Sequence, residues 1–152
     1  MQNNNEMRLD RYMTSNEVVE LMKFNNLSTL TQPGYGFADR NNIEAVMIGG
    51  TRGYRVEDVI RGALNEIETA SEWIEFSEKL WAWQREKATP RAVELGVDCV
   101  TVHDAMAILG IGSRERMYQL GDWRGGPVRT IEFGRVRLYS RADVEAVQHA
   151  RV

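Results

Sequence analysis

Apolar residues recur at helical spacing soon after two threonines, Thr14 and Thr101, one in each half of the chain. An acidic residue stands three positions after each, Glu17 and Asp104, so each half predicts a helix that begins with a capping box. Aspartate reaches the backbone less well than glutamate, so the second box is the weaker. One helix face is then apolar in each half: Val18, Val19, Leu21 and Met22, and Ala105, Met106, Ile108 and Leu109.

In the second half the pattern predicts a second helix after a short turn. Gly110 ends the first helix, and Ser113 can cap the next one. Met117 and Leu120 return to the core at helical spacing. This is a helix-turn-helix layout. The residues left on its outer side are Arg114, Arg116, Tyr118 and Gln119.

The rest of this half alternates like a β-hairpin. Residues 128–133 and 136–139 predict two strands joined at Gly134-Arg135, and residues 141–147 predict a last helix. The signature Tyr-x-x-x-Asp-Val opens that helix, and it also occurs in the first half, from Tyr54 to Val59 and from Tyr139 to Val144. The sequence therefore contains an internal repeat. We expect both tyrosines to anchor the hairpins in the core, and Asp58 and Asp143 to cap or pair at the last helices.

The first half is less regular in its middle. Residues 25–31 predict a short polar helix with no basic residue, and residues 32–42 read as a loop-rich insertion. A strand over 45–48, a turn over 49–53, a return strand over 54–56 and a helix over 57–64 follow.

Between the halves, residues 67–95 predict an amphipathic helix with three of the four tryptophans, ended or kinked at Thr89-Pro90. Its apolar arc covers about half of the circumference, wider than a single stripe. Two interpretations stay open: packing against the chain's own domains, or a homodimer through this helix.

The expected fold is mainly α with small β-hairpin wings, as two tandem winged helix-turn-helix domains joined by a long helix. The predicted boundaries are 1–66, 67–95 and 96–152.

Charge changes this picture in one place. The net charge is −3, which argues against a bulk polyanion binder. Seven arginines nevertheless lie between Ser113 and Arg141, against three acidic residues, Glu115, Asp122 and Glu132. This local excess is a candidate electrostatic footprint, and ordinary surface ion pairs are the competing interpretation.

Little in the sequence favours catalysis, so we expect no enzyme, no cofactor and no metal. The two histidines, His103 and His149, have no metal-ligand spacing, and Cys99 has no local catalytic partner. The glycine pairs lack the Lys-Ser/Thr of a phosphate loop. A single cysteine, no secretory signal and no long apolar run favour a cytoplasmic protein, in a bacterial host cell or associated with its nucleoid, without a membrane partner.

The second half resembles the excisionase-like branch of the mercury-resistance-regulator (MerR) superfamily of winged helix-turn-helix domains. The likeness covers roughly residues 97–150: Val100–Ile111, Ser113-Arg114, Phe133–Tyr139 and Arg141–Val144. The first half matches only at its two ends, and it lacks arginines where the recognition helix would lie.

The resemblance implies that Arg114 and Arg116 contact bases or phosphates, with Tyr118 and Gln119 as secondary contacts. It implies phosphate contacts for Arg135 and Arg137 on the hairpin. In the first half, the resemblance implies contacts to DNA phosphates for four polar residues, Ser28, Thr29, Thr31 and Gln32. It also implies a position at the wing turn for Arg52. Trp123 is expected to cover the core.

Three functions remain open. The first is a sequence-specific double-stranded DNA-binding protein, either a transcriptional regulator or a recombination-directionality factor of a phage or mobile element. The second is a phage packaging or assembly adaptor, similar to small terminase subunits, with one module on DNA and one on protein. The third is an anti-host factor that binds only protein.

Overall fold

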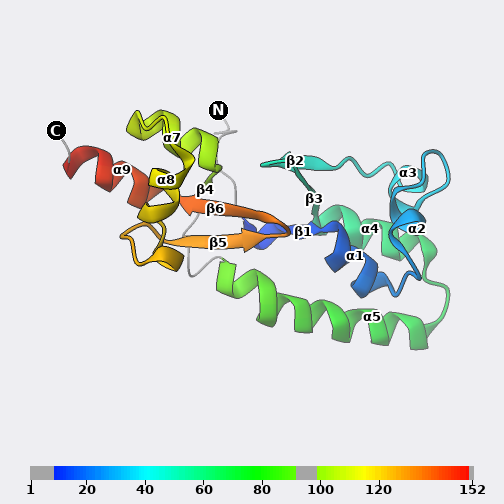
Figure 1. Ribbon diagram of the computed structural model, residues 1–152. Helices are drawn as coiled ribbons and strands as arrows, with labels where there is room; N and C mark the ends of the chain where they lie inside the picture. Colours follow the sequence, from blue (N-terminus) through cyan, green and yellow to red (C-terminus); the bar gives the residue numbers. More distant parts are fainter. Residues whose placement is uncertain (1–8, 92–98, 151–152) are drawn as a thin grey trace, which may run out of the picture. The chain divides into compact units, whose positions relative to one another are not determined.

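The computed structural model describes residues 9–91 and 99–150, and the chain divides between Thr89 and Pro90 into two compact units. The first comprises Asp10–Thr89. The second runs from Pro90, and Leu9 groups with it. The expected junction at residues 95–96 lies outside the described residues. Each unit is mainly helical and contains a small antiparallel sheet of three strands (Figure 1).

The first unit alternates short strands and helices and ends in a long helix. After the 3₁₀ turn η1 (Leu9–Arg11), its elements in chain order are β1 (Tyr12–Thr14), α1 (Ser15–Met22), α2 (Leu27–Thr31), α3 (Phe37–Arg40), β2 (Val46–Ile48), β3 (Thr51–Arg55), α4 (Val56–Glu66), α5 (Ala70–Trp83) and the π-helical turn η2 (Gln84–Ala88). The sheet order is β1-β3-β2.

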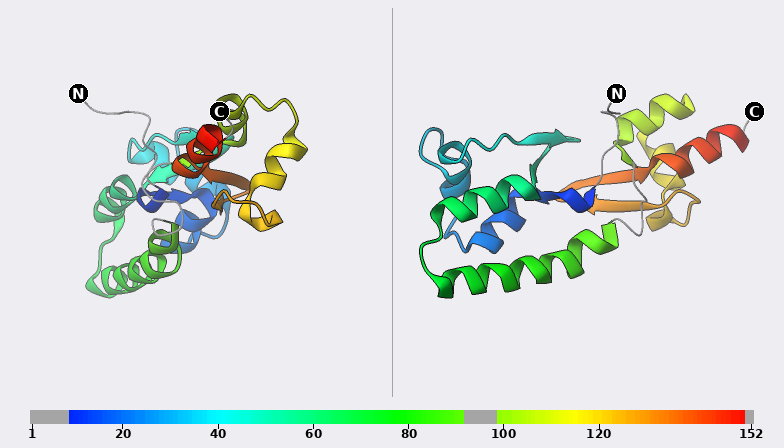
Figure 2. Two further views of the ribbon diagram at one scale, coloured as in Figure 1. Left: turned by 90° about the vertical axis from the view of Figure 1, so that its left-hand side faces the viewer. Right: turned by 180° about the vertical axis from the view of Figure 1, so that it is seen from behind.

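The elements of the second unit repeat the order from β1 to α4, with a 3₁₀ turn in place of α3 and no counterpart of α5 or η2 among its described residues. They are β4 (Cys99–Val100), α7 (Val102–Leu109), α8 (Arg114–Leu120), the 3₁₀ turn η3 (Asp122–Arg124), β5 (Thr130–Phe133), β6 (Val136–Ser140) and α9 (Arg141–Ala150). The sheet order is β4-β6-β5. Within this unit, α7, α8 and α9 gather at one end of the sheet, and the β5–β6 hairpin extends away from them (Figures 1 and 2).

The repeat is present in the backbone as well as in the sequence. Thr14 and Thr101 cap α1 and α7, and the residue nine positions later, Lys23 or Gly110, is left-handed in both. Twelve positions after the threonine, Asn26 or Ser113 caps the following helix by accepting a hydrogen bond from the backbone of its third residue. The two halves therefore place their helix caps and left-handed turn residues at equivalent positions, although their side chains differ.

The hairpins are anchored at equivalent tyrosines. Met13 lies opposite Tyr54 in the first sheet, and Val100 lies opposite Tyr139 in the second. Both tyrosines are buried, and burial raises the pKa of the Tyr139 phenol. The expectation that they are core residues is confirmed.

The first hairpin differs from its expected form. Gly49 and Gly50 both have positive φ and close a two-residue turn, so β3 already begins at Thr51. The expected turn over 49–53 is therefore too long. Arg52 stands in strand β3, opposite Met47, and not at the wing turn.

Helix α5 packs into the core of the first unit. Phe76 and Trp83 belong to its buried cluster together with Val18, Leu21 and Tyr54. The indole Nε1 of Trp83 donates to Oε1 of Glu17 at 3.0 Å, and Glu17 also completes the capping box of α1. The Trp-rich helix thus contributes one face to the first unit. A separate buried cluster around Val100, Met117 and Tyr139 forms the second core.

Candidate nucleic-acid interface

The two arginines of helix α8, Arg114 and Arg116, are exposed on either side of its buried face. Ser113 accepts a hydrogen bond from the backbone N–H of Arg116 at 3.3 Å and fixes where the helix begins. Met117 is fully buried, and Leu120 packs against the same core. Because these two residues set the rotation of the helix, Arg114, Arg116 and Gln119 are exposed, as the sequence predicts, while Tyr118 is half-buried.

Arg114 is held by the preceding helix. Its Nη2 lies 2.7 Å from Nε2 of His103 on α7. A guanidinium can only donate, so this contact requires an unprotonated Nε2 on the imidazole. His103 therefore orients Arg114 without neutralising its charge.

Arg116 carries the least compensated charge on α8. It is exposed, and within residues 9–91 and 99–150 it makes no hydrogen bond or ion pair through its guanidinium. Arg135, on the hairpin, is likewise exposed, and its guanidinium makes no hydrogen bond or ion pair within the same ranges. The β5–β6 turn consists of Gly134, with φ of 65°, and Arg135, so the turn places this arginine at its outer corner.

An aromatic and basic group connects α8 to the hairpin. We call Tyr118, Trp123, Arg124 and Arg137 the Trp123 cluster. The Tyr118 and Trp123 rings meet edge-on, with centroids 5.8 Å apart. The guanidinium carbons of Arg137 and Arg124 lie 4.7 and 5.3 Å from the Trp123 ring centre. Trp123 remains 44% exposed, so it lies at the surface rather than covering the core as expected.

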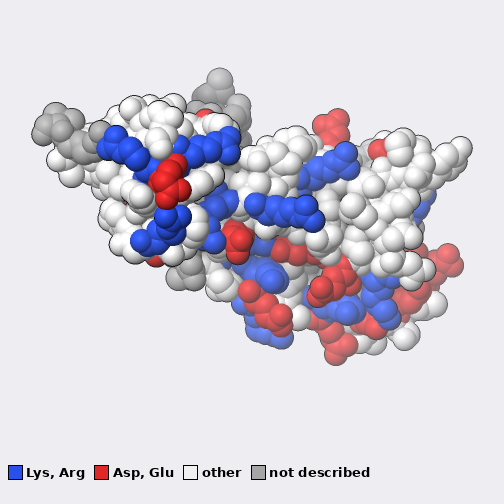
Figure 3. All heavy atoms as spheres, viewed as in Figure 1, with Lys and Arg blue, Asp and Glu red and all other residues white. Residues whose placement is uncertain are grey.

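The charges of this cluster are partly compensated. Arg124 pairs with Glu115 on α8 at 2.7 Å. Arg137 donates to Oγ1 of Thr130 at 2.9 Å and lies 3.8 Å from Glu132. Both pairs lie at the surface, with Arg137 half-buried, and surface ion pairs of this kind contribute little to stability. In Figure 3 basic side chains surround an acidic patch over this end of the second unit.

Arg129 has a structural role instead. Its guanidinium donates twice to Asp143 at 2.8 and 3.1 Å, and its backbone N–H donates to the same carboxylate at 2.9 Å. These hydrogen bonds from Arg129 hold the pKa of Asp143 below its ordinary value. Asp58 pairs with Arg61 at 2.9 Å. Both aspartates of the repeated signature are therefore paired, as expected.

The corresponding helix of the first unit, α2, lacks this chemistry. Counted from the capping threonines, Leu27 and Thr29 occupy the positions of Arg114 and Arg116, and Leu30 is buried as Met117 is. Thr29 Oγ1 donates to Asn26, its own helix cap, and Ser28 Oγ donates to Gln32.

On the first hairpin, Arg52 occupies the position of Arg137, since each stands two residues before the buried tyrosine of its unit, Tyr54 or Tyr139. It is exposed and makes no side-chain hydrogen bond or ion pair with the described residues.

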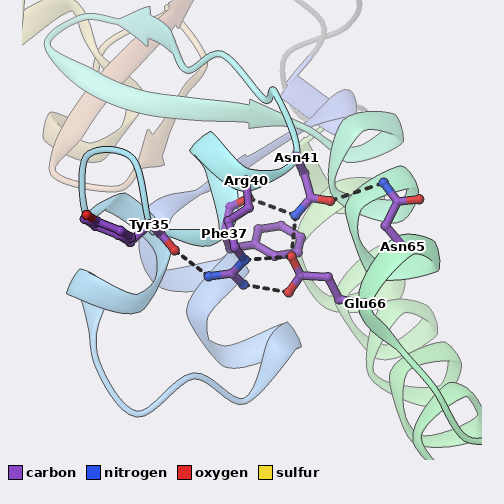
Figure 4. A network of polar contacts seen from close by, with 6 residues as sticks. All are labelled: Tyr35, Phe37, Arg40, Asn41, Asn65 and Glu66. Atoms are coloured by element: carbon purple, nitrogen blue, oxygen red, sulfur yellow. Dashed lines mark hydrogen bonds and ion pairs between the residues drawn. The ribbon is translucent and has the colours of Figure 1, made fainter.

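A polar network stabilises the segment that replaces the expected loop (Figure 4). Arg40, at the end of α3, donates to both carboxylate oxygens of Glu66 at 2.9 and 2.6 Å and to the carbonyl of Tyr35. The buried Asn41 donates to Glu66 at 2.7 Å. The Arg40 hydrogen bonds lower the pKa of Glu66. Within residues 32–42, expected as an insertion, Phe37–Arg40 thus form helix α3, and Arg40 and Asn41 fasten the segment to α4.

Neither Trp123 nor Arg124 was among the residues that the sequence assigned to DNA contact. The available signal was a Trp-Arg pair followed by Gly125-Gly126-Pro127, which predicts a surface turn with an aromatic residue at its edge.

Among the described residues, no three histidine, cysteine or acidic side chains gather to hold a metal ion. In the same ranges, no helix has the length and apolarity needed to span a bilayer. No family model, curated protein or solved structure matches the chain.

Proposed function

We propose that the chain binds double-stranded DNA through its second unit, as a winged helix-turn-helix domain. In this proposal α8 enters the major groove and the β5–β6 hairpin forms the wing. The observation that carries it is the exposure of both Arg114 and Arg116 on α8, with Arg116 unpaired among the described residues. Arginine contacts the guanine edge through two parallel hydrogen bonds, and such contacts specify sequence.

The wing supplies the complementary contacts to the DNA backbone. Arg135 stands at the hairpin turn, and the Trp123 cluster offers Arg124 and Arg137 between the turn and α8. Phosphate contacts of this kind position a protein on the duplex and add affinity without reading the sequence. We therefore assign specificity to α8 and most of the salt dependence to the hairpin.

We propose that this binding serves transcription regulation or recombination directionality in a phage or mobile element. The tandem arrangement favours a non-palindromic target, because the two α2 and α8 surfaces differ in sequence at the equivalent positions Leu27 and Arg114, and Thr29 and Arg116. Two unlike modules in one chain would bind two unlike half-sites.

The test is a selection of bound fragments from random duplex DNA, followed by titrations on the selected site. Arg114→Ala with Arg116→Ala should weaken binding by about 1–3 kcal/mol for each lost base contact. Lys87→Ala is the control, because it removes an exposed cation from the first unit. Equal affinity of the double variant and the parent chain would refute the role of α8.

A second function is favoured by two exposed apolar residues of the first unit, Leu27 on α2 and Met47 on β2. Leu27 is 48% exposed where the second unit has Arg114, and Met47 is 59% exposed where it has Glu132. This surface suits a protein partner, as in a packaging or assembly adaptor. Hydroxyl-radical footprinting distinguishes the two functions. A protein that binds DNA through both units should protect two adjacent DNA segments, and Arg52→Ala should weaken its binding. An adaptor should protect one DNA segment, and Arg52→Ala should leave its DNA binding unchanged.

A further inference from the structure

Helix α5 has a second apolar face that the core of its own unit does not cover. Phe76, Leu80 and Trp83 point inward, and Phe76 and Trp83 are buried. Ile74 and Trp81 are 59% and 63% exposed. At 3.6 residues per turn these two side chains point within about 20° of each other and about 160° away from Phe76 and Trp83. They form a narrow outer ridge.

Two opposite charges belong to this ridge. Glu78 lies between Ile74 and Trp81, and Arg85 follows Trp81 by about one turn. Both side chains are exposed, and neither forms a hydrogen bond or ion pair within the described part of the chain. By contrast Glu75, on the flank of the same helix, is bound to Lys23 at 2.9 Å. The outer ridge therefore consists of Ile74, Glu78, Trp81 and Arg85, and its two charged side chains have no ion-pair partner among the described residues.

We propose that this ridge binds the same ridge of a second copy of the chain, with the two α5 helices antiparallel. A two-fold interface brings each residue against its counterpart in a reciprocal way. If the axis passes beside Trp81, Glu78 of each copy faces Arg85 of the other, because both lie three to four residues from Trp81. The two Trp81 side chains then cover each other at the centre. A parallel pair would place Glu78 against Glu78, so the charges select the antiparallel arrangement.

The size of the ridge indicates a weak dimer. One helix face with a single tryptophan at its centre is small beside a standard protein interface. The dimer would assemble in a concentration-dependent way, in the micromolar range. This inference does not depend on DNA binding, because α5 belongs to the first unit.

Sedimentation of the full chain without DNA, over a micromolar concentration series, tests the proposal. The parent chain should shift from monomer to dimer as concentration rises. Trp81→Ala, Glu78→Arg and Arg85→Glu should each raise the dimer dissociation constant about tenfold or more. Glu86→Arg reverses an exposed charge on another side of the helix and should leave it unchanged. Circular dichroism checks that each variant is folded.

The decisive sample is an equimolar mixture of the Glu78→Arg and Arg85→Glu chains. Alone, each chain places like charges opposite each other. In the mixture both facing pairs are again opposite in sign, so association should return to near the parent level. A parent chain that stays monomeric throughout the series, or a mixture no more associated than its components, would overturn the proposal.

Discussion

Arg114 and His103 are joined across the turn between α7 and α8, with Nη2 of the guanidinium 2.7 Å from Nε2 of the imidazole. The contact links the first turn of α7 to the first residue of α8. A long exposed side chain loses conformational freedom when it binds a partner molecule. Because His103 already restricts Arg114 in the unbound chain, part of that cost falls on folding instead of on binding.

His103→Ala should therefore weaken specific DNA binding by about 0.5–1.5 kcal/mol, the ordering cost of one flexible side chain. His103→Gln is the matched control, because its amide oxygen also accepts from the guanidinium and should restore most of the affinity. Fluorescence anisotropy on the selected site gives both values. Tighter binding by the alanine variant would show that His103 competes with DNA for Arg114.

Trp123→Ala should reduce DNA affinity through the arginines that its ring orients. The indole lies 4.7 Å from the guanidinium carbon of Arg137 and 5.3 Å from that of Arg124, and such cation–π contacts contribute about 0.5–1 kcal/mol each at exposed sites. Because these contacts already exist in the unbound chain, about 1–2 kcal/mol is the upper limit of the loss in binding. The control is Tyr35→Ala, which removes a 78% exposed aromatic residue from the first unit. Equal losses for both variants would rule out a specific role for the cluster.

Leu30→Ala and Leu27→Ala test the orientation of α2 with two substitutions on one short helix. Leu30 is 1% exposed and Leu27 is 48% exposed. Truncating the buried leucine should cost about 2–5 kcal/mol in the free energy of unfolding, and the exposed one less than about 0.5 kcal/mol. Urea denaturation measures both. Similar costs would mean that α2 is rotated from the position described above.

Much of the second unit could be predicted from local sequence because each of its elements has its own signal. Thr101, Gly110 and Ser113 mark helix ends, and Gly134 marks the hairpin turn. The first unit has weaker signals at the same positions. Lys23 adopts a left-handed conformation without being glycine, and Asn26 caps a helix of only five residues.

The segment around α3 could not be predicted, because its order depends on contacts distant in sequence. Arg40 and Glu66 are 26 residues apart, and Asn41 binds the same carboxylate. The Trp123 cluster is similar, since Arg137 reaches the indole of η3 from strand β6. Charge counting also overstated the basic surface, because Arg124 and Arg129 are paired with Glu115 and Asp143.

Acid should destabilise both units through their paired carboxylates. The folded-state pKa of Asp143 is lowered by Arg129 and that of Glu66 by Arg40. A carboxyl with a lowered pKa stabilises the fold above its unfolded pKa, near 4, and that contribution is lost as the pH falls through the folded pKa. Each partner arginine is more than a third exposed, so solvent screening limits each contribution to less than about 1 kcal/mol.

Asp143→Asn and Glu66→Gln should therefore lower the free energy of unfolding at pH 7 and flatten its decline below about pH 4, where the parent carboxylates become protonated. Glu145→Gln, an exposed acid on α9, is the control and should leave the profile unchanged. Urea titrations at successive pH values give the profiles. Because Asp143 lies in the second unit and Glu66 in the first, each substitution should change the transition of its own unit. Variants with the same acid dependence as the parent chain would show that these pairs do not carry the pH response.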